Sequence, residues 1–152
     1  MTPLTALPGV WVGPGEGHYP TIDPFGYREE LTFTRLGDKP ILHYAQRTWH
    51  ADDGRPLHTE CGYLRTDGDR VELIVAQPTG FAECHHGRVD GDVIAFGLTT
   101  FGRVATARPV QTLRRRWALV DGALHVDLWM SFAGVVDAHH LHAELERRAR
   151  CR

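Results

Sequence analysis

Hydrophobic and polar residues alternate along most of this chain. Tyr27, Leu31 and Phe33 fall on one face of an extended strand, with charged and threonine side chains on the other face. Later runs are rich in β-branched and aromatic residues, and each ends at a glycine, proline or aspartate turn signal. The strands predicted from these runs are residues 41–50, 57–66, 71–75, 81–86, 93–96, 111–120 and 123–132.

The turn signals recur about every 10 to 15 residues, and the strongest hairpin signal is Asp121-Gly122. This spacing predicts sequential antiparallel strands. Closing them into a barrel would remove the exposed strand edges. We therefore expect an all-β fold with little helix, in one domain over residues 1–152.

The segment 137–148 is open to two interpretations. Its composition favours a helix with Asp137 as a candidate N-cap. The same residues also alternate, because Leu141, Ala143 and Leu145 are separated by polar side chains. A barrel needs a closing strand, and tertiary context can override helix propensity.

Composition excludes several classes of protein. Charged residues make up 24% of the 152 residues, and the formal net charge is −2, which argues against a nucleic-acid partner. No apolar run is long enough for a transmembrane helix, and the N-terminus lacks the positive region of a signal peptide. Cys61, Cys84 and Cys151 form no Cys-x-x-Cys pair. We expect a cytoplasmic protein with reduced thiols and no membrane partner.

Residues 9–22 are dense in glycine, with four glycines placed around Trp11. The stretch leads to Pro20 rather than to a helix, so it is not a dinucleotide fingerprint, and it lacks the Lys-Ser or Lys-Thr pair of a phosphate loop. Glycine at this density lets backbones approach closely. The plain interpretation is an N-terminal strand whose tryptophan plugs one end of a β-barrel.

The same stretch reads Gly-x-Trp-x-Gly-x-Gly-x-Gly-x-Tyr-Pro-Thr-Ile and resembles the opening signature of the nitrobindins, a family of small heme-binding β-barrels. The resemblance spans roughly residues 7–148. It implies an up-and-down antiparallel barrel of about ten strands, like lipocalins and fatty-acid-binding proteins. It also implies an enzyme: a ferric protein with one heme b per chain that isomerises peroxynitrite to nitrate and binds nitric oxide.

The resemblance assigns the iron ligand near the C-terminus. In the family, a methionine-bearing strand is followed by a His-Leu segment whose histidine binds iron, and here Met130 precedes His140-Leu141 by ten residues. His140 is thereby implied as the proximal ligand. Strand alternation would turn His139 away from the cavity, while His142 would share the face of His140, about 7 Å further along.

Further pocket residues follow from the resemblance alone. Residues 56–65 are similar to a family strand that faces the distal side of the heme, where an apolar wall is expected. An arginine near the pocket suits a heme propionate, because guanidinium pairs bidentately with carboxylates. The implied heme-binding residues are Thr21 at the heme edge, Leu57 and His58 on the distal side, Gln77 in the wall, Arg108 for a propionate, Met130 near the proximal side, and His140.

Two other clusters are interpreted as structural. Residues 83–86, Glu-Cys-His-His, are expected to be an exposed strand end rather than a metal site, since one strand segment cannot supply tetrahedral geometry. Arg114 and Arg116 share one strand face, which predicts a solvated exterior.

Two other functions remain open. One is a carrier of an apolar ligand such as a fatty acid, in which Arg108 or another inward arginine would meet the carboxylate and His140 would be incidental. The other is a non-catalytic nitric oxide carrier or sensor with the same heme. The sequence does not decide between a monomer and a homodimer.

Overall fold

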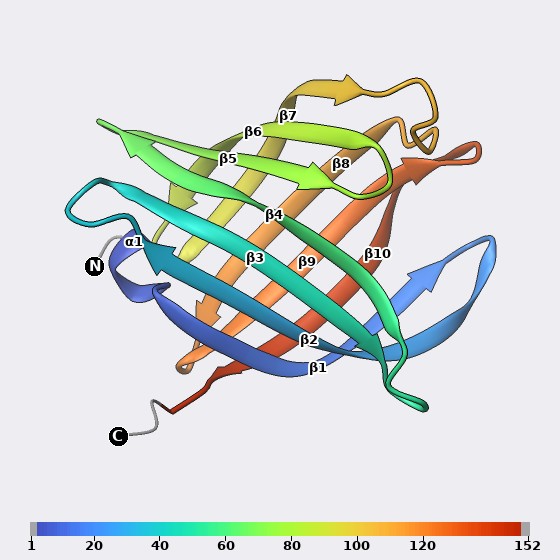
Figure 1. Ribbon diagram of the computed structural model, residues 1–152, viewed down its shortest axis with the longest axis horizontal. Coiled ribbons are helices and arrows are strands. Elements are labelled where there is room, and N and C mark those ends of the chain that lie inside the picture. Colours follow the sequence, from blue (N-terminus) through green and yellow to red (C-terminus); the bar gives the residue numbers. More distant parts are fainter. Residues whose placement is uncertain (1–2, 150–152) are drawn as a thin grey trace.

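A computed structural model describes residues 3–149, and Cys151 lies outside this range. The described chain forms one closed barrel of antiparallel strands, with a single short helix at one end (Figure 1). The elements are α1 (Pro3–Ala6), β1 (Gly9–Tyr19), β2 (Ile22–Arg35), β3 (Ile41–His50), β4 (Pro56–Asp67), β5 (Arg70–Gln77), β6 (Phe81–Asp90), β7 (Val93–Arg103), β8 (Thr112–Val120), β9 (Ala123–Phe132) and β10 (Val135–Arg147).

Each strand pairs with the next along the chain, and β10 closes the barrel against β1. The predicted all-β, up-and-down barrel of about ten strands is thus confirmed. The ambiguous C-terminal segment is a strand, since pairing with both β1 and β9 satisfies its backbone. Strands β6 and β7 are longer than predicted and end at Asp90 and Arg103. None of the helices in residues 3–149 has the length and hydropathy needed to cross a membrane.

The glycines of β1 allow close strand approach. A Cβ on Gly13 would lie 2.0 Å from the carbonyl oxygen of Glu144 on β10. A Cβ on Gly15 would lie 2.3 Å from the Tyr27 ring, which packs inside the barrel. Trp11 is buried near α1, and its indole nitrogen donates to the Leu7 carbonyl at 2.8 Å. The glycine-rich opening is therefore a strand fitted between two neighbours, as the sequence predicted.

Side chains fill one end of the barrel and leave the other end open. The larger apolar cluster, at the α1 end, centres on Trp117. Its ring contacts Phe33, Tyr44 and Phe96 at centroid distances of 4.9 to 5.4 Å. A smaller cluster, at the opposite end, includes Phe81. This asymmetry positions the cavity at the end away from α1.

Candidate functional site

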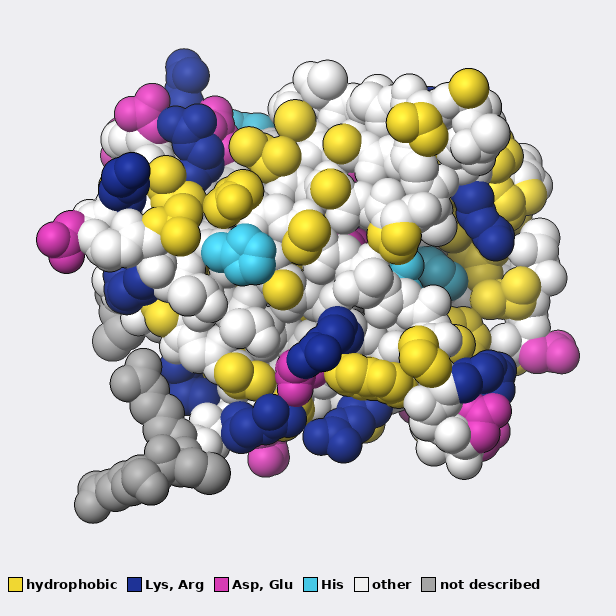
Figure 2. All heavy atoms as spheres, viewed as in Figure 1, with side chains coloured by type: hydrophobic (Ala, Val, Ile, Leu, Met, Phe, Trp, Pro, Cys, Tyr) yellow, Lys and Arg dark blue, Asp and Glu magenta, His cyan; other side chains and the backbone are white. Residues whose placement is uncertain are grey.

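A cavity of about 360 Å³ lies inside the barrel at the end formed by the smaller apolar cluster. Its volume falls in the range of pockets that hold small ligands and cofactors. Figure 2 shows the surface hollowed on the right of the viewed face, with histidine and hydrophobic side chains inside the hollow. The apolar lining consists of Ile22, Phe25, Leu57, Phe81, Val110, Leu113, Trp117, Val126, Leu128, Met130, Phe132 and Leu141.

A β-bulge in β10 aims His140 into this cavity. His139 pairs with Trp129, and Leu141 pairs with Leu128, so His140 is the extra residue between two adjacent partners on β9. Both His140 and Leu141 consequently line the cavity, although regular alternation would place them on opposite faces. Bulges commonly redirect side chains next to functional sites.

The environment of His140 fixes its protonation. Its Nδ1 lies 3.0 Å from the carbonyl oxygen of His18. A carbonyl can only accept, so Nδ1 carries the hydrogen and Nε2 of the neutral ring keeps its lone pair. Burial lowers the pKa of His140, against the opposing effect of the His18 carbonyl. Neutral imidazole with its second nitrogen held by a carbonyl is the form that binds metals.

Tyr19 holds the His140 ring from the side. The two ring centroids are 5.4 Å apart, and the planes meet edge to face at 74°. The Tyr19 hydroxyl donates to the carbonyl of Phe132 at 3.0 Å, which ties β1 to β9 across the bulged strand. The ring orientation of His140 is therefore set by a hydrogen bond and by packing.

The expectation that His142 shares the face of His140 is wrong, because the bulge shifts the alternation by one residue. His142 lies on the outside, where its Nδ1 is 2.8 Å from Asp127 Oδ1. His139 also lies outside, as predicted, with its Nε2 2.9 Å from the same oxygen.

His58 lines the cavity, and its side chain is partly exposed. Its backbone N–H donates to Thr48 Oγ1 at 3.0 Å, and the Thr48 hydroxyl donates back to its carbonyl at 3.3 Å. The ring Nε2 is 3.3 Å from Glu60 Oε2, so it carries the hydrogen that the carboxylate accepts. The backbone and the ring are thus both anchored.

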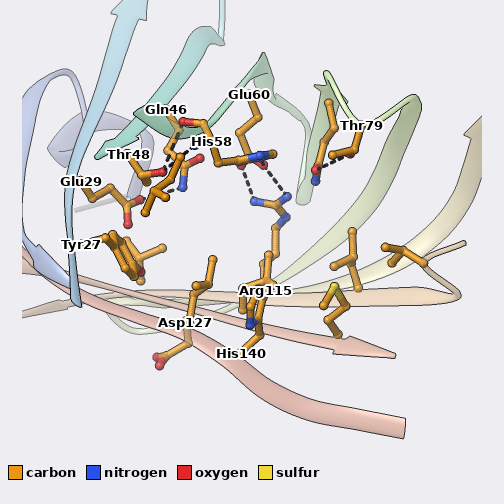
Figure 3. A pocket seen from close by; sticks show the side chains of 18 of the residues that line it. Tyr27, Glu29, Gln46, Thr48, His58, Glu60, Thr79, Arg115, Asp127 and His140 are labelled. Carbon is orange, nitrogen blue, oxygen red and sulfur yellow. Dashed lines mark hydrogen bonds and ion pairs between the residues drawn. The ribbon is translucent and has the colours of Figure 1, made fainter. Parts of the chain in front are cut away.

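The inner wall of the cavity contains a buried ion-pair network that the sequence analysis did not foresee. Arg115 donates to both oxygens of Glu60 at 2.6 and 3.0 Å, and to Glu83 Oε2 at 2.7 Å. Figure 3 shows the guanidinium pointing across the barrel toward Glu60. All three side chains are buried. The expected apolar distal wall is therefore wrong for the inner part of the cavity.

Neighbouring side chains extend the network around Glu60 and Glu83. The Tyr44 hydroxyl donates to Glu60 at 2.5 Å, and Gln77 Nε2 donates to Glu83 at 3.0 Å. Burial alone would raise the pKa of Glu60, but Arg115 outweighs it and holds that pKa well below its usual range. Glu83 and His85 are buried, so the prediction of an exposed strand end is also wrong.

The inward arginine carried a signal in the sequence. Arg114 and Arg116 face outward, as predicted, so strand alternation places Arg115 inside. Glu60 and Glu83 occupy inward positions of β4 and β6 by the same rule. The sequence did not indicate which acids pair with Arg115, because Glu60 and Glu83 lie 55 and 32 residues away along the chain.

Glu29 is a further buried acid that lines the cavity. Gln46 Nε2 donates to its Oε1 at 3.1 Å. Burial raises the pKa of Glu29 to about 7, outweighing the hydrogen bond from Gln46. The Glu29 carboxyl group therefore changes its charge near neutral pH.

The structure brings together nearly all residues that the resemblance assigned to heme. Those that line the cavity are Leu57, His58, Gln77, Arg108, Met130 and His140. Thr21 is not among the lining residues, because it lies exposed in the turn between β1 and β2, and the next residue, Ile22, takes the place at the wall.

The residues present fit a heme group. A heme needs an apolar slot, a good axial donor and groups that accommodate its propionates. The cavity is mainly apolar near His140, whose Nε2 is the available donor atom. Arg108 is exposed at the cavity rim, where a charged carboxylate could remain in water.

Comparison with known proteins agrees with this geometry. Residues 1–147 match the family described as THAP4-like, heme-binding beta-barrel domain. The chain is 46% identical over 145 residues to peroxynitrite isomerase 1 of Rhodococcus jostii (strain RHA1), covering 95% of this chain and 82% of the relative. It is 38% identical over 148 residues to a peroxynitrite isomerase of Arabidopsis thaliana, covering 97% and 88%.

A solved structure shows the same fold. The crystal structure of Rv2717c from M. tuberculosis superimposes with a TM-score of 0.85 at 39% identity, covering 98% of this chain and 99% of the other. The match in sequence spans nearly the whole barrel and includes the strand that carries His140. The chain therefore belongs to the THAP4-like, heme-binding β-barrel family, the nitrobindin family that its opening signature resembles.

Proposed function

We propose that this protein is a heme-dependent peroxynitrite isomerase, with one ferric heme b per chain and His140 as the proximal iron ligand. The family and the relatives named peroxynitrite isomerase support the activity. The observation that carries the assignment of the ligand is the bulge that turns His140 into the cavity, with its Nδ1–H committed to the His18 carbonyl.

The chain's own residues set the properties of this site. When bound, ferric heme supplies a Lewis acid for the rearrangement of peroxynitrite to nitrate. The carbonyl of His18 polarises the imidazole of His140 and makes Nε2 a stronger donor. Leu57, Phe81 and Met130 give the cavity an apolar surface against which a porphyrin could pack.

The distal side favours the ferric state. His58 directs its Nε2–H at Glu60 Oε2 and not at the space inside the cavity. That N–H is therefore not available to a ligand inside the cavity. A site of this kind suits chemistry at ferric iron better than reversible oxygen storage.

Arg108 is proposed to pair with a propionate at the cavity rim. The position is exposed, so an ion pair there would contribute little to affinity and would mainly orient the group. An Arg108→Gln variant is expected to retain heme with a small loss of affinity.

The fatty-acid carrier would have to bind its ligand carboxylate through Arg108 at the cavity rim. The inward arginine, Arg115, is already neutralised by Glu60 and Glu83, so it is not available to a ligand carboxylate. A nitric oxide carrier with the same heme uses the same pocket, and binding of nitric oxide is proposed here as a companion property.

The activity is tested by stopped-flow mixing of peroxynitrite with the heme-loaded ferric protein. We expect faster decay and a higher nitrate yield than in buffer, with both effects lost in His140→Ala. An unchanged nitrate yield with the heme-loaded wild type would remove the isomerase assignment and leave the carrier or sensor.

A further inference from the structure

A second cluster of ligand-type side chains lies on β9 and β10, with two histidines outside the barrel and an aspartate whose residue also borders the cavity wall. It consists of Asp127, His139 and His142, here called the outer triad. One oxygen of Asp127 lies 2.9 Å from His139 Nε2 and 2.8 Å from His142 Nδ1. The three ligand atoms all lie within 4.8 Å of one another. Two imidazoles therefore converge on a single carboxylate oxygen.

The bulge at His140 creates this convergence. On a regular strand, residues 139 and 142 would face opposite sides of the sheet. The extra residue restores His142 to the outer face, where it pairs directly with Asp127 on β9. One irregularity thus sends His140 inward and gathers two histidines outside.

The donor set suits a first-row transition metal. Two imidazole nitrogens and one carboxylate oxygen are typical Zn²⁺ ligands, at about 2.0 to 2.2 Å from the ion. Tetrahedral ligands at that range are about 3.3 Å apart, so each contact to Asp127 needs to open by roughly half an ångström. His139 and His142 are 40% and 36% exposed, which leaves rotamer freedom for this movement and space for a water ligand.

The carboxylate is already oriented for such a role. The Asp127 side chain is 11% exposed, and its second oxygen lies 3.4 Å from Arg116 Nη1 on β8. Figure 3 shows the carboxylate turned away from the cavity. A hydrogen-bond donor on the oxygen that does not bind the metal orients a ligating carboxylate and strengthens metal binding.

We propose that the outer triad is a Zn²⁺-binding site, separate from the cavity that holds heme. An alternative set, His125, His142 and Glu144, shares His142 through its other nitrogen. That set is looser, since the contacts to Glu144 are 3.5 and 3.9 Å and Glu144 is exposed. The Asp127 carboxylate is buried and held by Arg116, whereas the Glu144 side chain is exposed, and this difference favours the outer triad.

The site is tested by calorimetric titration of Zn²⁺ into the heme-loaded protein without an affinity tag, and by the visible spectrum of added Co²⁺. We expect one ion per chain and a tetrahedral Co²⁺ band. Removing a ligand in His139→Ala or Asp127→Asn should weaken Zn²⁺ binding roughly 10- to 100-fold or more. His125→Ala and the exposed outer His86→Ala are the matched controls and should bind as wild type does.

A His140→Ala arm separates the two sites. It should keep Zn²⁺ binding whether or not heme is retained, because His140 faces the cavity. Loss of Zn²⁺ binding in this variant would place the ion in the cavity and overturn the proposal. The proposal also fails if wild type binds no Zn²⁺, if His139→Ala binds normally, or if His125→Ala is the variant that loses the ion.

Discussion

Replacing Arg115 by methionine should strongly destabilise the barrel. Methionine keeps the length of the buried stem but removes the charge that neutralises Glu60 and Glu83. Breaking a buried ion pair from one side costs about 3 to 5 kcal/mol. At about 2 to 4 °C per kcal/mol for a domain of this size, the Tm of the heme-free protein should fall by roughly 6 to 20 °C.

The pH dependence of the loss is a sharper test than its size. The folded-state pKa of Glu60 is lowered, so its ion pair stabilises the wild type above the ordinary carboxyl pKa of 4.5. That contribution is lost as the pH falls through the folded pKa. In Arg115→Met the contribution is absent, and protonation instead relieves the buried charges. The difference in Tm between the two proteins should therefore shrink below about pH 4.5.

The assay is thermal unfolding followed by circular dichroism at pH 7 and pH 4, with one compensating variant. Combining Arg115→Met with Glu60→Gln and Glu83→Gln removes all three buried charges, and this triple variant should recover much of the lost Tm. A single Arg115→Met variant that is as stable as wild type at pH 7, or a Tm difference that does not change with pH, would refute the reasoning.

Three further changes test other parts of the barrel by urea denaturation of the heme-free protein. The pKa of Glu29 is raised from 4.5 to about 7, so between these values the folded protein holds a proton that the unfolded chain has released. As the pH rises from 4.5 to 7, the free energy of unfolding of wild type should therefore fall by roughly 3 kcal/mol relative to Glu29→Gln. Parallel curves of unfolding free energy against pH would contradict this. Gly13→Ala should cost about 1 to 3 kcal/mol because its Cβ meets the backbone of β10, whereas Gly97→Ala has open space and should be neutral. Tyr19→Phe should cost about 1 kcal/mol through the lost bond to the Phe132 carbonyl, and an unchanged free energy of unfolding would exclude that role.

The strands could be predicted because their signal is local. Alternation around Tyr27 and the turn at Asp121-Gly122 each depend on a few consecutive residues, and the structure follows both. Segment 137–148 needed the rest of the barrel, because helix propensity and alternation pointed to different structures. The two free edges of β1 and β9 decide in favour of a strand.

The residues that line the cavity could be predicted only where the family resemblance assigned them. Alternation alone puts His140 opposite Leu141, and the bulge that brings both inside depends on its pairing with β9. The network around Arg115 joins three strands that are distant in sequence, so no local pattern announces it. Strand alternation did place Arg115, Glu60 and Glu83 inside the barrel, and a buried charge needs an oppositely charged partner. The sequence therefore indicated that ion pairs exist, but not which residues form them.

The central claim is that His140 is the heme ligand, and the visible spectrum of heme-supplemented protein tests it most directly. Wild type and His139→Ala should both show the Soret band of bound heme, because His139 lies outside the barrel. His140→Ala should lose that band while keeping the circular dichroism of the folded barrel. A full Soret band in folded His140→Ala, or its loss in His139→Ala instead, would contradict the account.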